Sequence, residues 1–117
     1  MDSKKLIGSI MNDLVFYLLE NDAHLVSSEV VSLENNFHIV IEGNIDDKNR
    51  EKIERELKIL SKMKDHPELK YYSSLSQLAN GLEGIYVLAP YIKKLDFASD
   101  EGKIIIEIFV DKSKHST

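Results

Sequence analysis

The chain has 117 residues, of which 43% are hydrophobic and 30% charged, and its formal net charge is -5. This length and composition are those of one folded domain rather than a disordered segment. Lysines and glutamates are interspersed, whereas nucleic-acid binding needs a clustered basic surface, so we expect no nucleic-acid partner. The chain has no cysteine, which excludes disulfides, thiolate metal sites and a cysteine nucleophile. No apolar run is long enough to span a membrane and no signal-peptide pattern is present, so we expect a cytoplasmic protein without a membrane partner.

A first helix is predicted over residues 4–20, with Ser3 as its cap, because apolar side chains recur at spacings of three and four. The apolar stripe is wider than a helix needs to pack on one sheet. We therefore expect its second flank to form the interface of a homodimer, related by a two-fold axis. The alternative is that helices between residues 67 and 91 cover this flank within one chain. The interface side chains are expected to include Val15, Phe16 and Leu19.

A β-hairpin is predicted next, with strands over residues 25–33 and 37–42 and a polar, Asn-containing loop between them. Gly43 and Asn44 are expected to break the second strand. A second helix then starts at the cap Asp46 and ends near residue 64, before a proline. Its apolar residues form a narrow stripe, so its outer face is expected to be solvated.

The second half of the chain predicts a less regular segment over residues 67–82 and a short helix over 84–91. A second hairpin follows. Apolar and charged side chains alternate over residues 95–97, residues 100–102 form a turn, and residues 103–110 form the strongest strand of the sequence. We expect one domain over residues 1–111 and a disordered tail over 112–117. No internal repeat is evident. The predicted class is α+β, with helices on a mostly antiparallel sheet.

The stretch over residues 80–110 carries a family resemblance. It begins Asn80-Gly81-Leu82-Glu83-Gly84, continues into a helix and ends in the terminal hairpin. This arrangement resembles the last third of a GHKL-type ATPase domain, the ATP-binding fold of histidine kinases and anti-sigma-factor kinases. The resemblance extends with fewer matching residues over 10–42. It implies a two-layer α/β sandwich with helices on one face of a mostly antiparallel sheet.

The resemblance also implies positions for a nucleotide site. In similar domains the first long helix carries an acid and, four residues later, an asparagine that binds the magnesium ion of ATP, and these positions fall on Asp13 and Tyr17. An acid at a strand end, followed by a glycine, recognises adenine, and these positions fall on Glu42 and Gly43. Without that resemblance, Tyr17 is a core or interface aromatic and Glu42 a solvent-facing residue on a sheet edge.

The third motif of the family is a glycine-rich turn at a helix start, where backbone N–H groups bind phosphates. It falls on Gly81 and Gly84, which otherwise form a helix stop and a tight connection. Glu83 would bring negative charge towards the phosphates, and the phenol at position 17 is a poor magnesium ligand because hard cations prefer carboxylate and amide oxygens.

These departures favour a degenerate ATPase-fold domain that acts as a regulatory or protein-interaction module without kinase chemistry. On this hypothesis we expect no catalytic residue, no cofactor and a regulatory protein partner. One alternative is a functional ATP-binding domain that binds ATP with Mg through atypical ligands. The other is an unrelated α+β binding domain. The histidines at positions 24, 38, 66 and 115 have no metal-ligand spacing, so no metal site is expected.

Overall fold

The computed structural model describes residues 3–65 and 89–112. Its elements are α1 (Ser3–Glu20), β1 (Val26–Ser32), β2 (Asn36–Asn44), α2 (Asp47–Asp65), the 3-10 helix η3 (Ala89–Tyr91), β3 (Lys94–Asp100) and β4 (Lys103–Asp111). The segment predicted over 67–82, most of the helix predicted over 84–91 and nearly all of the predicted tail lie outside the described residues. The end of that predicted helix is the single 3-10 turn of η3.

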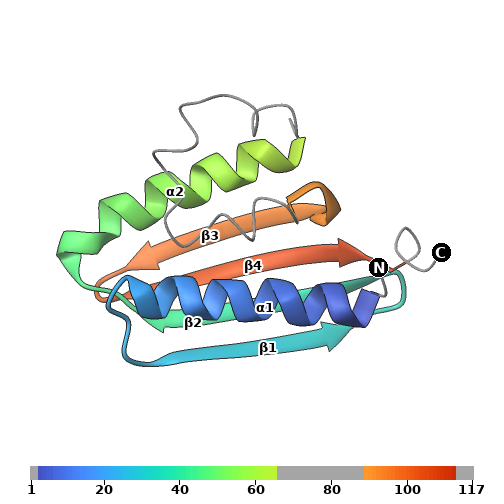
Figure 1. Cartoon of the computed structure of the whole chain (residues 1–117), viewed down its shortest axis with the longest axis horizontal. Helices are drawn as coiled ribbons and strands as arrows, with labels where there is room; N and C mark the ends of the chain where they lie inside the picture. The colour runs from blue at the N-terminus through green and yellow to red at the C-terminus, as the bar shows by residue number, and fades with distance from the viewer. Residues whose placement is uncertain (1–2, 66–88, 113–117) are drawn as a thin grey trace.

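The four strands form one antiparallel sheet in the order β1-β2-β4-β3. Each hairpin pairs its own two strands, and the two hairpins meet through β2 and β4, where Ile41 lies opposite Ile106. Both helices lie on the same face of the sheet, α1 along β1 and β2 and α2 along β3 (Figure 1). The predicted α+β class, a two-layer sandwich with helices on one face of an antiparallel sheet, is therefore confirmed.

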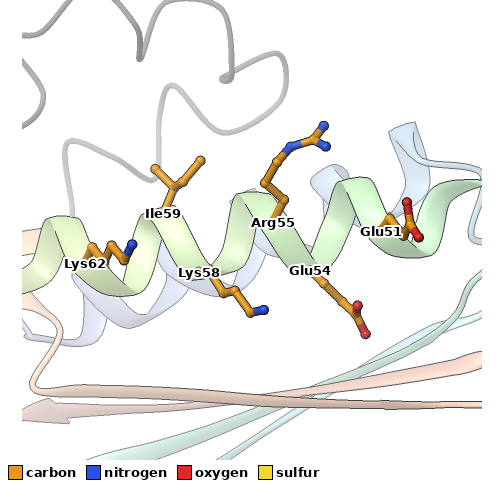
Figure 2. Close-up of a pocket in the computed structure, with 6 residues that line it drawn as sticks. All are labelled: Glu51, Glu54, Arg55, Lys58, Ile59 and Lys62. Atoms are coloured by element: carbon orange, nitrogen blue, oxygen red, sulfur yellow. The ribbon is translucent and has the colours of Figure 1, made fainter.

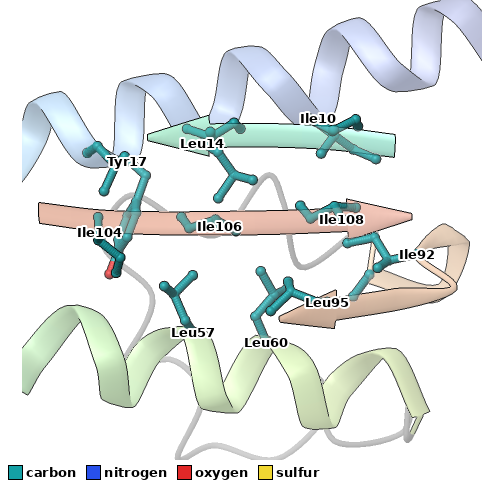
Figure 3. Close-up of a cluster of buried hydrophobic side chains, with 14 of the residues drawn as sticks. Ile10, Leu14, Tyr17, Leu57, Leu60, Ile92, Leu95, Ile104, Ile106 and Ile108 are labelled. Carbon is teal, nitrogen blue, oxygen red and sulfur yellow. The ribbon is translucent and has the colours of Figure 1, made fainter. Parts of the chain in front are cut away.

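The core lies between the helices and the sheet (Figure 3). Because successive strand residues point to opposite faces, every second residue of β2 and β4 is buried under the helices. Residues three and four apart on each helix supply the other side of this core. The fully buried side chains include Ile10, Leu14, Ile39, Ile41, Ile53, Leu57, Leu60, Ile104, Ile106 and Ile108.

The second strand is longer than predicted, since it runs through Gly43 and Asn44. Gly43 is buried against α1, where an added Cβ would lie 3.0 Å from Leu18 Cδ1. The glycine is thus a point of close approach between helix and sheet rather than a strand end. Asn44 is also retained in the ladder, and its side chain accepts hydrogen bonds from the backbone N–H groups of His24 and Leu25, both at 2.9 Å.

The end of α1 has the backbone geometry of a helix C-cap. Asp22 adopts a φ of 73°, and the backbone N–H of Ala23 donates to the carbonyl of Leu18 at 3.0 Å. A residue in the left-handed region followed by this bond closes the last helical turn. The same feature reverses the chain into β1, so that α1 and β1 run in opposite directions (Figure 1).

Candidate functional site

Tyr17, the position matched with a magnesium-binding asparagine, is fully buried at the contact between the two helices. Its hydroxyl donates to Oε1 of Glu56 on α2 at 2.5 Å. Glu56 is itself 3% exposed, so this bond joins α1 to α2 within the core. The phenol therefore has a structural partner that the sequence pattern did not indicate.

A cluster of polar side chains surrounds this bond at the end of α1. Lys52 Nζ donates to Asn21 Oδ1 at 2.7 Å and lies 3.9 Å from Glu56 Oε1. Asn21 Nδ2 donates in turn to the carbonyl of Tyr17 at 2.9 Å. The cluster supplies hydrogen-bond partners to buried polar groups, as the low dielectric of an interior requires.

Asp13 lies one turn before Tyr17 on α1 and is half-buried. Burial raises the pKa of its carboxyl group above the usual 3.8, since desolvation disfavours the charged form. Asp13 and Tyr17 thus share one side of α1, as the four-residue spacing requires.

Glu42 points away from the helices, because its neighbours Ile41 and Gly43 are buried on the helix side of β2. The predicted position on a sheet edge is wrong, since β2 lies between β1 and β4. Its carboxylate pairs with Lys103 Nζ on β4 at 2.7 Å. This pairing raises the pKa of Lys103, first through the hydrogen bond and then through the opposite charge. The sheet therefore separates Glu42 from Asp13 and Tyr17. Gly43 faces α1, and Gly81 and Gly84 lie outside the described residues.

The face of the sheet opposite the helices carries a second group of side chains. The rings of His38 and Phe109 stack with centroids 4.3 Å apart, and His38 Nε2 lies 3.9 Å from Glu107 Oε1. That nitrogen makes no hydrogen bond. Among the described residues, no group of three or more His, Asp or Glu side chains is placed to hold a metal ion.

Two surface hollows lie along α2. The hollow in Figure 2, of about 370 Å³, follows the outer side of α2 and has a mainly charged lining. Another, of about 330 Å³, lies between α2 and β3. The Figure 2 hollow is lined by Glu51, Glu54, Arg55, Lys58, Ile59 and Lys62. Glu51, Arg55, Lys58 and Lys62 are exposed to solvent, which confirms the predicted solvated outer face of α2.

Exposed apolar side chains gather at the opposite edge of the molecule. Phe16 and Leu19 on the outer side of α1 are 54% and 44% exposed, and Leu25 before β1 is 73% exposed. Of the large hydrophobic side chains exposed in the described part of the chain, all but Tyr91 belong to α1, β1 or the residues next to β1. We call this surface the apolar edge. Its residues are Phe16, Leu19, Leu25, Val30, Val31 and Leu33.

The two edge strands of the sheet differ in kind. β3 carries Lys94, Asp96 and Asp100, has α2 packed beside it, and fixes Ser99 between Arg50 and Glu54 of that helix. β1 has the sequence VSSEVVS with Glu29 as its single charge. Charged side chains and a covering helix are the usual protection of an edge strand against pairing with another chain. β3 has both kinds of protection, whereas β1 has the single charge of Glu29, and none of the described helices lies beyond its outer side (Figure 1).

Comparisons with known proteins add no family to this picture. No protein-family model matches the chain, and no curated protein or solved structure matches it significantly. Neither described helix has the length and apolar character needed to span a bilayer. The apolar edge is the surface feature of the described residues that indicates a function.

Proposed function

We propose that this domain is a protein-interaction module that acts through the apolar edge. The observation that carries the proposal is the concentration of exposed apolar side chains on α1 and β1. Isolated apolar residues are normal on protein surfaces, but a cluster of them on adjoining elements marks an interaction surface. The sequence-based expectation of an interface on α1 supports the same surface, with Phe16 and Leu19 exposed and Val15 half-buried.

The backbone of β1 adds a second means of binding to this surface. An edge strand offers N–H and C=O groups to an incoming strand, and apolar side chains on either side of it supply specificity. The apolar edge has the backbone groups of an edge strand and apolar side chains on both sides of it, because Val30 lies on the helix side of β1 and Val31 on the opposite side.

The module in this proposal acts without kinase chemistry, as a degenerate relative of the GHKL-type domain that its sequence resembles. Two contacts support this part. The Tyr17 hydroxyl is engaged by a buried carboxylate, and Glu42 is paired with Lys103 on the far side of the sheet from Tyr17. Neither side chain is free to bind a nucleotide without breaking these contacts.

A site-specific photo-crosslinker tests the proposal. A benzophenone amino acid replaces Leu25 on the apolar edge, or Ala98 on β3 as the matched control, in cells that produce the protein natively. Both positions are exposed and both lie at sheet edges. We expect irradiation to give a discrete protein adduct from position 25 and none from position 98. Absence of an adduct at both, or equal adducts at both, would show that the apolar edge is not the docking surface.

A further inference from the structure

We propose that the occupant of the apolar edge is a second copy of this chain. The two β1 strands pair antiparallel about a two-fold axis at Ser28, and the two four-stranded sheets join into one continuous sheet. The two α1 helices then lie side by side on the same face. This inference rests on the proposed function, since it names the partner of the same surface.

The backbone of β1 shows which groups are open to a second strand. Asn44 N–H donates to the carbonyl of Leu25 at 3.2 Å, and Leu33 N–H donates to the carbonyl of Asn36 at 2.9 Å. Hydrogen-bonded pairs alternate along an antiparallel ladder, so the residues at odd positions between 25 and 33 direct their backbone groups to β2. The residues that direct N–H and C=O outward are Val26, Ser28, Val30 and Ser32.

The side chains of β1 favour a two-fold axis at Ser28 over one at Glu29. A two-fold axis at Glu29 would place two glutamates directly opposite each other, which is destabilising. An axis at Ser28 instead places Val26 opposite Val30 of the second copy, and Leu25 opposite Val31. Apolar side chains then meet on both faces of the joined sheet, and Glu29 faces Ser27. Ser28 itself becomes a hydrogen-bonded pair with its own copy.

The position of α1 fits this arrangement. α1 contacts both β1 and β2, so its axis lies about one strand spacing, ~5 Å, from the two-fold axis. Two copies would then hold their α1 helices ~10 Å apart, within the 8–10 Å range of packed helices. A helix centred over β4 would leave a gap too wide for direct packing. The location of α1 near the sheet edge therefore supports a second copy rather than a lone peptide strand.

The facing sides of the two helices are also complementary. Leu18 packs beside Gly43 and Val26, and rises of ~1.5 Å per helix residue and ~3.3 Å per strand residue place Ser28 level with residues 13–14. A two-fold axis at this level brings Gly8 to Leu19 of the second copy. Apart from its chain neighbours and the nearby backbone of α1, nothing lies within 4 Å of a Cβ built on Gly8, so there is room for that leucine.

The same axis also brings complementary residues together along the rest of the contact between the two α1 helices, here called the helix seam. Met11 is half-buried and lies seven residues before Leu18, so it shares the side of α1 that packs beside Val26. It falls opposite Val15 and Phe16 of the second copy. Lys5 near the start of α1 falls opposite Asp22 beyond its end, so that opposite charges meet at both ends of the seam.

Single-cysteine variants test the register, because the natural chain has no cysteine. Across a hydrogen-bonded antiparallel pair the Cα atoms are ~5.5 Å apart, within disulfide range. We expect Ser28→Cys to form a covalent dimer under mild oxidation. Val30→Cys is offset by four residues from its own copy in this register and should stay monomeric on a non-reducing gel, as should the β3 control Ala98→Cys. Cross-linking of Val30→Cys or Ala98→Cys in preference to Ser28→Cys would overturn the inference.

Sedimentation equilibrium of the purified chain at micromolar concentration tests the dimer itself. We expect a dimer, and Ser28→Pro should raise its dissociation constant roughly tenfold or more by removing outward N–H groups. The matched variant Ser27→Pro breaks the ladder to β2 instead and is expected to destabilise the fold. Val30→Lys, which places a charge on the edge without changing the backbone, should also dissociate the dimer while its circular dichroism stays native.

The outcomes separate this inference from the proposed function. A native-like monomer, together with a photo-crosslinked adduct of a different protein at position 25, would refute self-pairing and leave the interaction module intact. A monomer that forms no adduct at all would refute both. A dimer unaffected by Ser28→Pro and Val30→Lys would place the interface elsewhere and refute self-pairing through β1.

Discussion

Tyr17 illustrates how one residue can satisfy a family pattern by position and still have another role. The spacing from Asp13 matched a metal-binding pair, while the fold uses the phenol to satisfy Glu56 in the core. The apolar neighbours of Tyr17 in the sequence were the better guide, since they indicated a core position. Its partner could not be predicted, because a contact between two helices depends on their relative rotation.

Replacing Tyr17 with Phe tests this role. The variant keeps the ring but leaves the buried Glu56 carboxylate without its hydroxyl donor, which should lower the free energy of unfolding by about 1–3 kcal/mol. Urea denaturation measures the change. The double variant with Glu56→Gln should recover part of the loss, because a neutral amide is less costly to bury than a carboxylate. A change below ~0.5 kcal/mol, typical of surface substitutions, would argue against a structural bond.

Asp13 allows a prediction about pH. Its pKa is raised in the folded chain by burial, so folding favours the protonated acid. The contribution of Asp13 to stability is fully present below its unfolded pKa and is lost as pH rises through the folded value. Asp13→Asn should therefore increase the melting temperature relative to the natural chain at pH 7, and this gain should shrink below about pH 3.8. Thermal melts at both pH values check the sign, and Asn12→Asp, on the exposed side of α1, is the control.

Among the elements, β4 is the best predicted and the most central. Its alternation in the sequence indicated one buried face, and Ile104, Ile106 and Ile108 are fully buried. Local periodicity was sufficient to predict the buried residues of β4, because apolar side chains must recur at every second residue of a strand that has one covered face.

A pair of neighbouring substitutions on β4 tests the assignment of its faces. Ile106→Asp places an uncompensated charge in the core and should abolish folding at 25 °C, since such burial costs several kcal/mol. Ile105→Asp places the same charge on the face away from the helices and should leave a cooperative unfolding transition. Circular dichroism and thermal melts compare the two. Equal stability of the two variants would mean that the faces are wrongly assigned.

Other features of the elements depended on contacts distant in the sequence. Gly43 and Asn44 resembled a strand end, but the first accommodates Leu18 and the second holds the backbone of residues 24 and 25. The excess apolar residues of α1 did predict an exposed flank. The sequence did not show that β1 adjoins this flank, because strand order in a sheet is set by long-range pairing.

At the scale of the whole molecule, the described elements form the same unit twice. α1-β1-β2 and α2-β3-β4 have the same order, and their final strands meet at the centre of the sheet. The two units differ on their outer surfaces, where the first is apolar and the second charged. No repeat is evident in the residues, so the correspondence lies in the topology alone.

The whole-molecule arrangement also bears on nucleotide binding. Because the sheet separates Glu42 from Asp13 and Tyr17, we expect the affinity for ATP with magnesium to be about millimolar or weaker, equivalent to only ~4 kcal/mol. Isothermal titration calorimetry with ATP, with and without magnesium, measures it. Micromolar binding that requires magnesium would instead favour the ATP-binding alternative, with the Gly81 and Gly84 turn as the next position to mutate.

The sheet order has a consequence for the speed of folding. Each hairpin closes between strands that are neighbours in the chain, whereas β2 and β4 must find each other across the whole of α2 and the segment that follows it. Closing so long a loop costs entropy before the core compensates for it, so this encounter should limit the folding rate. Ile41→Val, at the junction of the two halves, should then slow refolding in stopped-flow experiments. Val30→Ala, at the outer edge, should mainly accelerate unfolding.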